Sequence, residues 1–285
     1  MLTEYANSKL REMHSAAGAD AGEILRRAKS ILHRQGLISD VNDNILSPET
    51  RTSFFEVWSP FWFLPQRIGA EQKVALGASM LASWTAIAQI DNSVDEGNEL
   101  YNSPDKLLVA MSWDKTASDI LKLQTKWPDI VAVWSSQHHS ITQNDSPETI
   151  ILKKNPFYPE VFRIYLESHL PQLYHLGKKY TMMVGILDEA ADLMDDLSRG
   201  RPNYIAKKHG LSSGTGTSPT TLNNILTGGH IEEAISESLS LHAEILKTSE
   251  ENKLRLFADF LEYFKLSFEG YEEFCLARAL IFPRR

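Results

Sequence analysis

Two clusters of acidic residues have the spacing of a metal site. The first reads Asp91-Asn92-Ser93-Val94-Asp95-Glu96, and the second reads Asp188-Glu189-Ala190-Ala191-Asp192. In an α-helix of about 3.6 residues per turn, acids four positions apart project from the same side. Carboxylate oxygens suit Mg²⁺, which usually takes one or two of them while substrate phosphates and water fill its other positions. The two clusters therefore indicate chemistry on a phosphate compound bound with magnesium.

An apolar stripe leads into the first cluster. It consists of Leu76, Met80, Trp84 and Ile87. On a helix these residues share one face, and that face continues into Asp91 and Asp95. Solvated acids usually lie opposite the apolar face, so acids that continue it are expected to face a cavity, where a divalent cation would balance their charge. Trp84 is expected to line the same cavity.

The second cluster continues with further acids and then with cations. Asp188, Asp192 and either Asp195 or Asp196 recur on one side of the predicted helix. The basic residues that follow are Arg199, Arg201, Lys207 and Lys208. Arginine could bind diphosphate oxygens in bidentate fashion, and lysine could bind them as a point charge. The alternative is a solvated helix face with i,i+3 or i,i+4 ion pairs, each contributing about 0.2–0.5 kcal/mol.

The elements that must position these residues have the periodicity of helices. Apolar residues three and four apart dominate, whereas alternating runs of strand type are scarce, so the expected fold class is all-α. The predicted helices span residues 23–35, 70–95, 104–108, 117–126, 130–143, 159–166, 169–197, 220–226, 231–247 and 250–280. One domain over residues 1–285, with a flexible end at residues 1–22, is the expected organisation. The Gly/Ser/Thr-rich segment 210–219 is interpreted as either a lid or a plain connection.

Composition narrows the function classes. The chain has 29 basic and 37 acidic residues and a formal charge of -8, which argues against a general binder of nucleic acid or anionic membranes. Cys275 is the only cysteine, so an intramolecular disulfide and a cysteine-rich zinc site are excluded, and a packed thiol is expected. No stretch approaches ~18 consecutive apolar residues, so a membrane span is not expected. Charged residues interrupt the apolar positions of residues 1–25, so a signal peptide is not expected either. We expect a cytoplasmic protein.

The acidic clusters resemble the motifs of the trans-isoprenyl diphosphate synthase and class I terpene synthase superfamily. The first cluster is similar to the DDxxD motif, with asparagine in second place. The second continues as Leu193-Met194-Asp195-Asp196-Leu197-Ser198-Arg199-Gly200-Arg201-Pro202-Asn203-Tyr204. That run is similar to the acidic, then Gly-Arg/Lys, then Asn-Tyr segment found after the second motif of some polyprenyl and squalene/phytoene-type synthases.

The resemblance implies a fold and a set of site residues. It implies an isoprenoid-synthase-type helical bundle around a central cavity, with three Mg²⁺ ions bound together with a prenyl diphosphate. The implied catalytic and metal-binding residues are Asp91, Asp95, Asp188 and Asp192, with Glu96 as a further metal ligand. The implied substrate contacts are Arg199, Arg201, Tyr204, Lys208 and Trp84.

Departures from the superfamily pattern separate the candidate activities. Chain-elongating members of the superfamily bind a second substrate with basic segments. In this chain only Arg67 is a possible match to those segments, which points to a one-substrate enzyme. The resemblance then implies a class I terpene synthase: Mg²⁺-dependent ionisation of an allylic prenyl diphosphate (C10 to C20), cyclisation or quenching of the carbocation, and release of diphosphate. The Asn-Ser-Glu triad of many bacterial terpene synthases is absent at its usual spacing.

Two alternatives stay open. One is a prenyl diphosphate synthase or a head-to-head prenyltransferase of squalene/phytoene type. The other is a catalytically inactive helical subunit, which Asn92 in the first motif favours. The expected partner is a small prenyl diphosphate and not nucleic acid, and a homodimer is left open.

Overall fold

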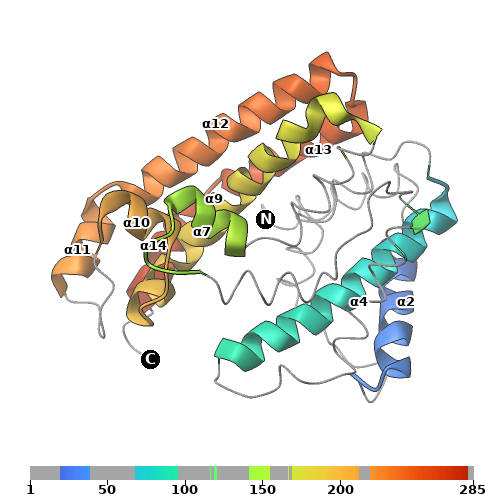
Figure 1. Cartoon of the computed structure of the whole chain (residues 1–285), viewed down its shortest axis with the longest axis horizontal. Helices are drawn as coiled ribbons and strands as arrows, with labels where there is room; N and C mark the ends of the chain where they lie inside the picture. Colours follow the sequence, from blue (N-terminus) through green and yellow to red (C-terminus); the bar gives the residue numbers. More distant parts are fainter. Residues whose placement is uncertain are drawn as a thin grey trace. The chain divides into compact units, whose positions relative to one another are not determined.

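The structure is a computed structural model that describes residues 20–38, 68–95, 116, 119–120, 141–154, 166, 169–211 and 219–281. Helices make up 82% of these residues and no strand occurs among them, which confirms the all-α fold class. The chain divides into two compact units, Met1–Val133 and Trp134–Arg285, and each is described by itself (Figure 1). The isoprenoid-synthase-type bundle and the single domain stay predictions.

In the first unit, α2 (Ala21–Arg34) packs against α4 (Ala70–Asp95). Asp20 begins α2 as its N-cap, because its side chain accepts a hydrogen bond from the backbone N–H of Glu23 at 3.0 Å. The buried face of α2 consists of Ile24, Ala28 and Leu32. This face has the four-residue spacing of a helix that buries one side. An ion pair of 2.5 Å between Arg27 and Glu71 joins the two helices at their surface.

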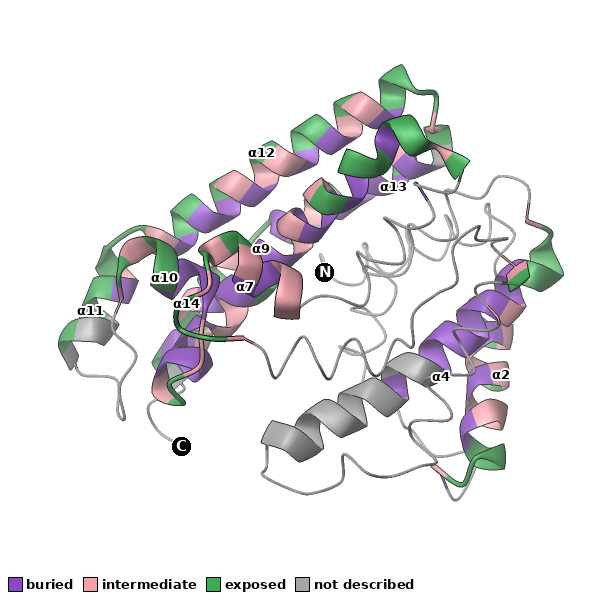
Figure 2. Cartoon of the chain, viewed as in Figure 1, coloured by how far each residue is buried: buried purple, intermediate pink, exposed green. Residues whose placement is uncertain are grey.

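The bounds of α4 agree with the sequence prediction at both ends. Leu76 and Met80, the first two members of the apolar stripe, are fully buried. The helix is buried on nearly every side between Lys73 and Ala82 (Figure 2). A helix with apolar residues all round is stable only in such surroundings.

In the second unit, α9 (Tyr174–Ser198) and α12 (His230–Glu251) form the central pair. They run antiparallel, since Lys179 pairs with Glu244 at 2.6 Å and Met183 lies opposite Ser238. The Ser238 hydroxyl is fully buried and donates to the Met183 carbonyl at 2.7 Å. Figure 2 shows the buried faces of both helices.

Shorter helices surround this pair. They are α7 (Pro147–Lys154), a 3₁₀ turn (Pro171–Leu173), α10 (Tyr204–His209), α11 (Pro219–Thr227), α13 (Arg255–Phe264), a second 3₁₀ turn (Lys265–Phe268) and α14 (Tyr271–Ile281). Phe257, Phe260 and Phe264 of α13 are buried, with Phe257 stacked on Phe260 and Phe264 tilted against Phe260. Cys275 of α14 is 2% exposed, which confirms the packed thiol.

Three helix predictions are wrong in part. The predicted helix 250–280 is broken, because Lys253 and Gly270 adopt left-handed backbone conformations with φ of 58° and 72°. The predicted helix 169–197 begins only at Tyr174, since Pro171 opens a separate 3₁₀ turn. Residues 141–143, the end of the predicted helix 130–143, form an extended stretch and a turn.

Two helices were not predicted at all. Both α7 and α10 are short, at 8 and 6 residues, so they give little periodicity to recognise. The predicted helices 104–108, 117–126 and 159–166 lie wholly or almost wholly outside the described residues, as do most of the segment 210–219 and residues 1–19.

The described helices contain none that is long and apolar enough to cross a membrane.

Candidate carboxylate site on α9

The five acids of α9 have different surroundings. Asp188 is exposed and makes no hydrogen bond or ion pair with another described residue. Asp192, one turn further on, is partly exposed and pairs with Arg278 of α14 at 2.8 Å. The remaining three acids are buried: Glu189, Asp195 and Asp196. Only the first two are therefore open to a ligand.

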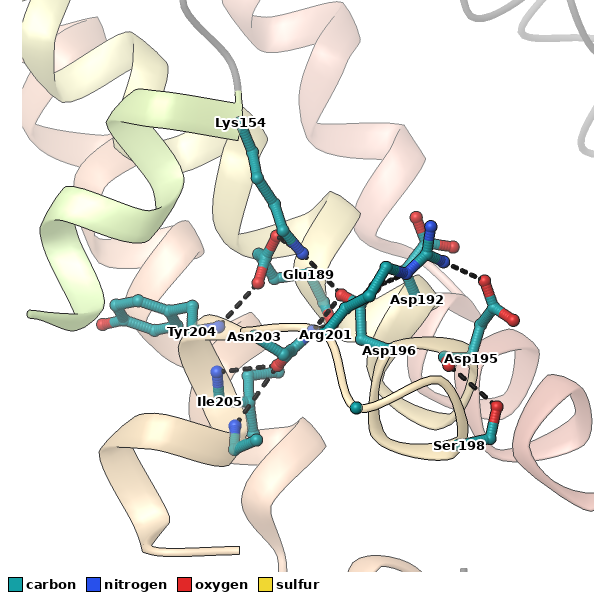
Figure 3. A network of polar contacts seen from close by, with 12 residues as sticks. Lys154, Glu189, Asp192, Asp195, Asp196, Ser198, Arg201, Asn203, Tyr204 and Ile205 are labelled. Atoms are coloured by element: carbon teal, nitrogen blue, oxygen red, sulfur yellow. Dashed lines mark hydrogen bonds and ion pairs between the residues drawn. The ribbon is translucent and has the colours of Figure 1, made fainter. Parts of the chain in front are cut away.

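A buried lysine holds the two most deeply buried acids. The Lys154 ammonium lies 2.9 Å from Glu189 Oε1 and 2.6 Å from Asp196 Oδ2 (Figure 3). Burial lowers the pKa of Lys154, but the charges of the two carboxylates outweigh that effect and raise it overall. Lys154 is the last residue of α7, so this charge cluster fixes the end of α7 to the middle of α9.

The chain reverses after α9 and returns to the same acids. Gly200 adopts φ of 68°, and Arg201 N–H donates to the Asp196 carbonyl at 2.7 Å, a Schellman-type helix end. The Arg201 side chain then pairs with Asp195 and, at 3.0 Å, with Asp196. Arg199 pairs with Asp195 at 2.8 Å. Both arginines thus balance acids of α9 itself.

Asn203 fixes the start of α10 to α9. Its side-chain oxygen accepts from the backbone N–H groups of Ile205 and Ala206 at 2.9 and 3.2 Å, which makes it the N-cap of α10. Its side-chain nitrogen donates to the Glu189 carbonyl at 2.9 Å and to Asp196 Oδ2 at 3.0 Å. Figure 3 shows Asn203 between the helix end and the carboxylates. Every polar atom of this side chain has a partner.

Tyr204 and Lys208 face α12. Tyr204 N–H donates to Glu189 Oε2 at 2.6 Å, whereas its hydroxyl donates to Glu237 at 2.8 Å. Lys208 pairs with Glu237 at 2.9 Å and with Glu233 at 3.0 Å. Burial and the Glu237 hydrogen bond raise the pKa of the Tyr204 hydroxyl. Tyr204 is therefore a neutral hydrogen-bond donor at neutral pH.

The two open acids repel each other. Desolvation by the surrounding protein and the charge of Asp192 raise the pKa of Asp188. Desolvation also raises the pKa of Asp192, against the lowering effect of Arg278. Asp188 nevertheless has accessible surface, and water therefore weakens the effect of burial at this side chain. A divalent cation between two such carboxylates would relieve both the repulsion and the desolvation.

Among the described residues, the acids of α9 outnumber their basic partners. The five carboxylates of α9 have four described partners, which are Lys154, Arg199, Arg201 and Arg278. Asp188, at the exposed end of the cluster, has no described basic partner, and its raised pKa favours the neutral form. A cation bound there would favour the charged form.

The structure brings together only part of the predicted site. Asp188 and Asp192 lie one turn apart as predicted, but Arg199, Arg201 and Lys208 are engaged with carboxylates of the protein, and Tyr204 with Glu237. Lys207 donates to the Gln143 carbonyl at 2.7 Å. Glu96 lies outside the described residues, and the side chains of Trp84, Ile87, Asp91 and Asp95 are not described.

Sequence reasoning missed three partners of the α9 acids: Lys154, Asn203 and Arg278. Asn203 carried a usable signal, because asparagine after Gly200 and Pro202 is typical of an N-cap that follows a helix end. Lys154 and Arg278 carried none, since nothing in their local sequence indicates contact with α9. Among the residues that the structure describes, no group of three or more His, Cys, Asp and Glu residues could hold a metal ion.

Comparisons with protein-family models, with curated proteins and with solved structures gave no match.

Proposed function

We propose that the chain is a class I terpene synthase that ionises an allylic prenyl diphosphate of C10 to C20 length and lets the carbocation cyclise or react with water. The single observation that supports this best is the state of Asp188 and Asp192. They are the accessible carboxylates of α9, one turn apart, with raised pKa values, and Asp188 has no described basic partner. The motif resemblance at residues 188–204 supports the same proposal.

The carboxylate oxygens of Asp188 and Asp192 are the type of ligand that magnesium prefers. Two carboxylates one helical turn apart match the one or two that Mg²⁺ normally takes from a protein when phosphates and water complete its shell. Asp188 and Asp192 would hold an ion, and Asp91, Asp95 and Glu96 stay the proposed metal ligands of the first cluster. When bound, Mg²⁺ would supply positive charge that stabilises diphosphate as it leaves the substrate.

The other residues would keep the site in shape. The Lys154 cluster and Asn203 hold the backbone of α9 rigidly behind Asp188 and Asp192, so these carboxylates would need little reorganisation to bind. Arg278 neutralises Asp192 as long as no other cation does. Asp192 would exchange this partner when it binds a metal.

A direct assay tests the proposal. The protein is incubated with Mg²⁺ and geranyl, farnesyl or geranylgeranyl diphosphate, and both diphosphate release and extractable organic products are measured. We expect a hydrocarbon or alcohol from one of the three substrates, and a loss of about a hundredfold or more in rate for Asp188→Asn. The control is Asp259→Asn, because Asp259 is an exposed acid of α13 far along the chain from the cluster. Equal rates for the two variants would refute the role of Asp188.

The same assay separates the prenyltransferase alternative. If longer diphosphates form, and only when isopentenyl diphosphate is added, the chain is a prenyl diphosphate synthase. A head-to-head condensation would instead join two molecules of one substrate.

The inactive-subunit alternative has an observation of its own. Arg199, Arg201 and Lys208 are engaged with protein carboxylates. An inactive subunit predicts no diphosphate release from any of the three substrates, with or without isopentenyl diphosphate.

A further inference from the structure

A pocket of about 420 Å³ lies in the second unit and does not include the open acids of α9. Its cations are Arg201 and Lys207, its carboxamides are Gln143 and Asn203, and its apolar wall contains Ile150 and Leu211. None of its described lining residues is acidic, and neither Asp188 nor Asp192 belongs to it. A pocket of this volume is large enough for a small organic ligand.

Lys207 differs from the other strong bases of its region. In residues 141–154 and 169–211, every other lysine and arginine pairs with a carboxylate. These bases are Lys153, Lys154, Lys178, Lys179, Arg199, Arg201 and Lys208. Lys207 donates instead to the carbonyl of Gln143, which is neutral. Its positive charge is thus not balanced by a described acid, and none of the other described residues that line its pocket is acidic.

The walls of the pocket are held by contacts outside it. Asp195 and Asp196 fix the Arg201 guanidinium from the side of α9. The Gln143 side chain donates to the Gly200 carbonyl at 3.1 Å and so ties the turn before α7 to the turn after α9. Asn203 is fixed by its four hydrogen bonds. A ligand would therefore meet a preformed site and would not have to order it.

We propose that this pocket binds a small phosphate-bearing ligand, with the phosphate at Lys207 and the organic part against Ile150 and Leu211. The lysine ammonium is a compact charge that suits a phosphate, whereas the charge of Arg201 is already balanced by Asp195 and Asp196. The chain as a whole is acidic, at -8, so an anion would be attracted only to such a local cation. This inference stands apart from the terpene synthase proposal.

Inorganic diphosphate in the presence of EDTA is the probe, since without Mg²⁺ the carboxylate site has nothing with which to hold an anion. The whole chain is titrated at constant ionic strength with sodium chloride, and binding is followed by ¹H–¹⁵N NMR. We expect saturable shifts centred on the amides of Ala206, Lys207 and Leu211. We also expect Lys207→Gln to weaken binding about fivefold or more, the loss of one charge contact.

Three variants complete the test. Lys178→Gln is the matched control, because Lys178 is an exposed lysine of α9 and its change should leave binding unaltered. Lys207→Arg should retain binding, since it keeps the charge. Asp188→Asn should also retain binding, which separates this pocket from the proposed metal site.

Any of four results would overturn the proposal. The first two are that diphosphate shows no saturable binding below about 10 mM, or that Lys207→Gln and Lys178→Gln weaken its binding equally. The other two are that Asp188→Asn abolishes the binding, or that acetate binds with the same affinity as diphosphate.

Discussion

Replacement of Lys154 by methionine tests whether the buried charge cluster holds the second unit together. Methionine has a similar length and no charge, so the change removes the two ion pairs of 2.9 and 2.6 Å while filling most of the space. It leaves Glu189 and Asp196, which are 1% and 2% exposed, without their cation. Removal of one partner from a buried ion pair typically costs about 3–5 kcal/mol.

The pH dependence of this loss has a definite sign. Burial raises the pKa of Glu189 above its value in the unfolded chain, and loss of the Lys154 charge would raise it further. A carboxyl whose pKa is higher in the folded chain than in the unfolded chain favours folding while it is protonated. This contribution is complete below the pKa of the unfolded chain and is lost as the pH rises through the pKa of the folded chain. The destabilisation by Lys154→Met should therefore be largest above neutral pH and should shrink as the pH falls towards 4.5, the ordinary value for glutamate.

Urea unfolding followed by circular dichroism, at a mildly alkaline and a mildly acidic pH, measures both effects. The matched control is Lys153→Met, because Lys153 pairs at 3.0 Å with Asp145 near the surface and its loss should cost below about 1 kcal/mol. The reasoning fails if the two variants are equally stable, or if the loss in Lys154→Met does not change with pH.

Three further changes have expected outcomes. Lys253→Gly should raise the free energy of unfolding by about 0.5–1 kcal/mol in a denaturant titration, because glycine adopts φ of 58° without strain; a loss of stability would contradict this. Asn203→Ala should lower it by about 2–3 kcal/mol, since a helix cap and two buried hydrogen bonds disappear, and a loss below about 0.5 kcal/mol would show that the cap is dispensable. Arg278→Met should raise the pKa of Asp192 in a carboxyl ¹³C NMR titration, because Arg278 lowers it in the native chain; an unchanged pKa would show that the ion pair does not form in solution.

The long helix α4 is one that the sequence predicts well. Residues 70–95 carry an unbroken apolar pattern, and the structure has α4 at those bounds. The predicted helix 250–280 failed because the chain leaves the helical conformation at Lys253 and at Gly270. A lysine in a left-handed conformation gives no sequence signal, whereas Gly270 gave one that the prediction did not use.

The sequence allowed the acids of the site to be predicted, but not the residues that pair with them. The spacing of four identified Asp188 and Asp192, since helical geometry alone puts such residues on one side. It could not show that Asp196 would be buried beside Lys154, because that contact joins residues 42 positions apart. Nor could it show that Arg201 turns back to α9, which depends on the left-handed backbone of Gly200.

The buried Cys275 offers a practical use that its packing role does not suggest. Burial raises the pKa of its thiol to about 12, and the thiolate is the form that attacks thiol-labelling reagents, so the folded chain should resist labelling at neutral pH. Because the chain has no second cysteine, each labelled molecule is one in which α14 has left its place. The rate of labelling, measured by mass spectrometry, would therefore report how often α14, the helix that carries Arg278, opens. No engineered probe is needed.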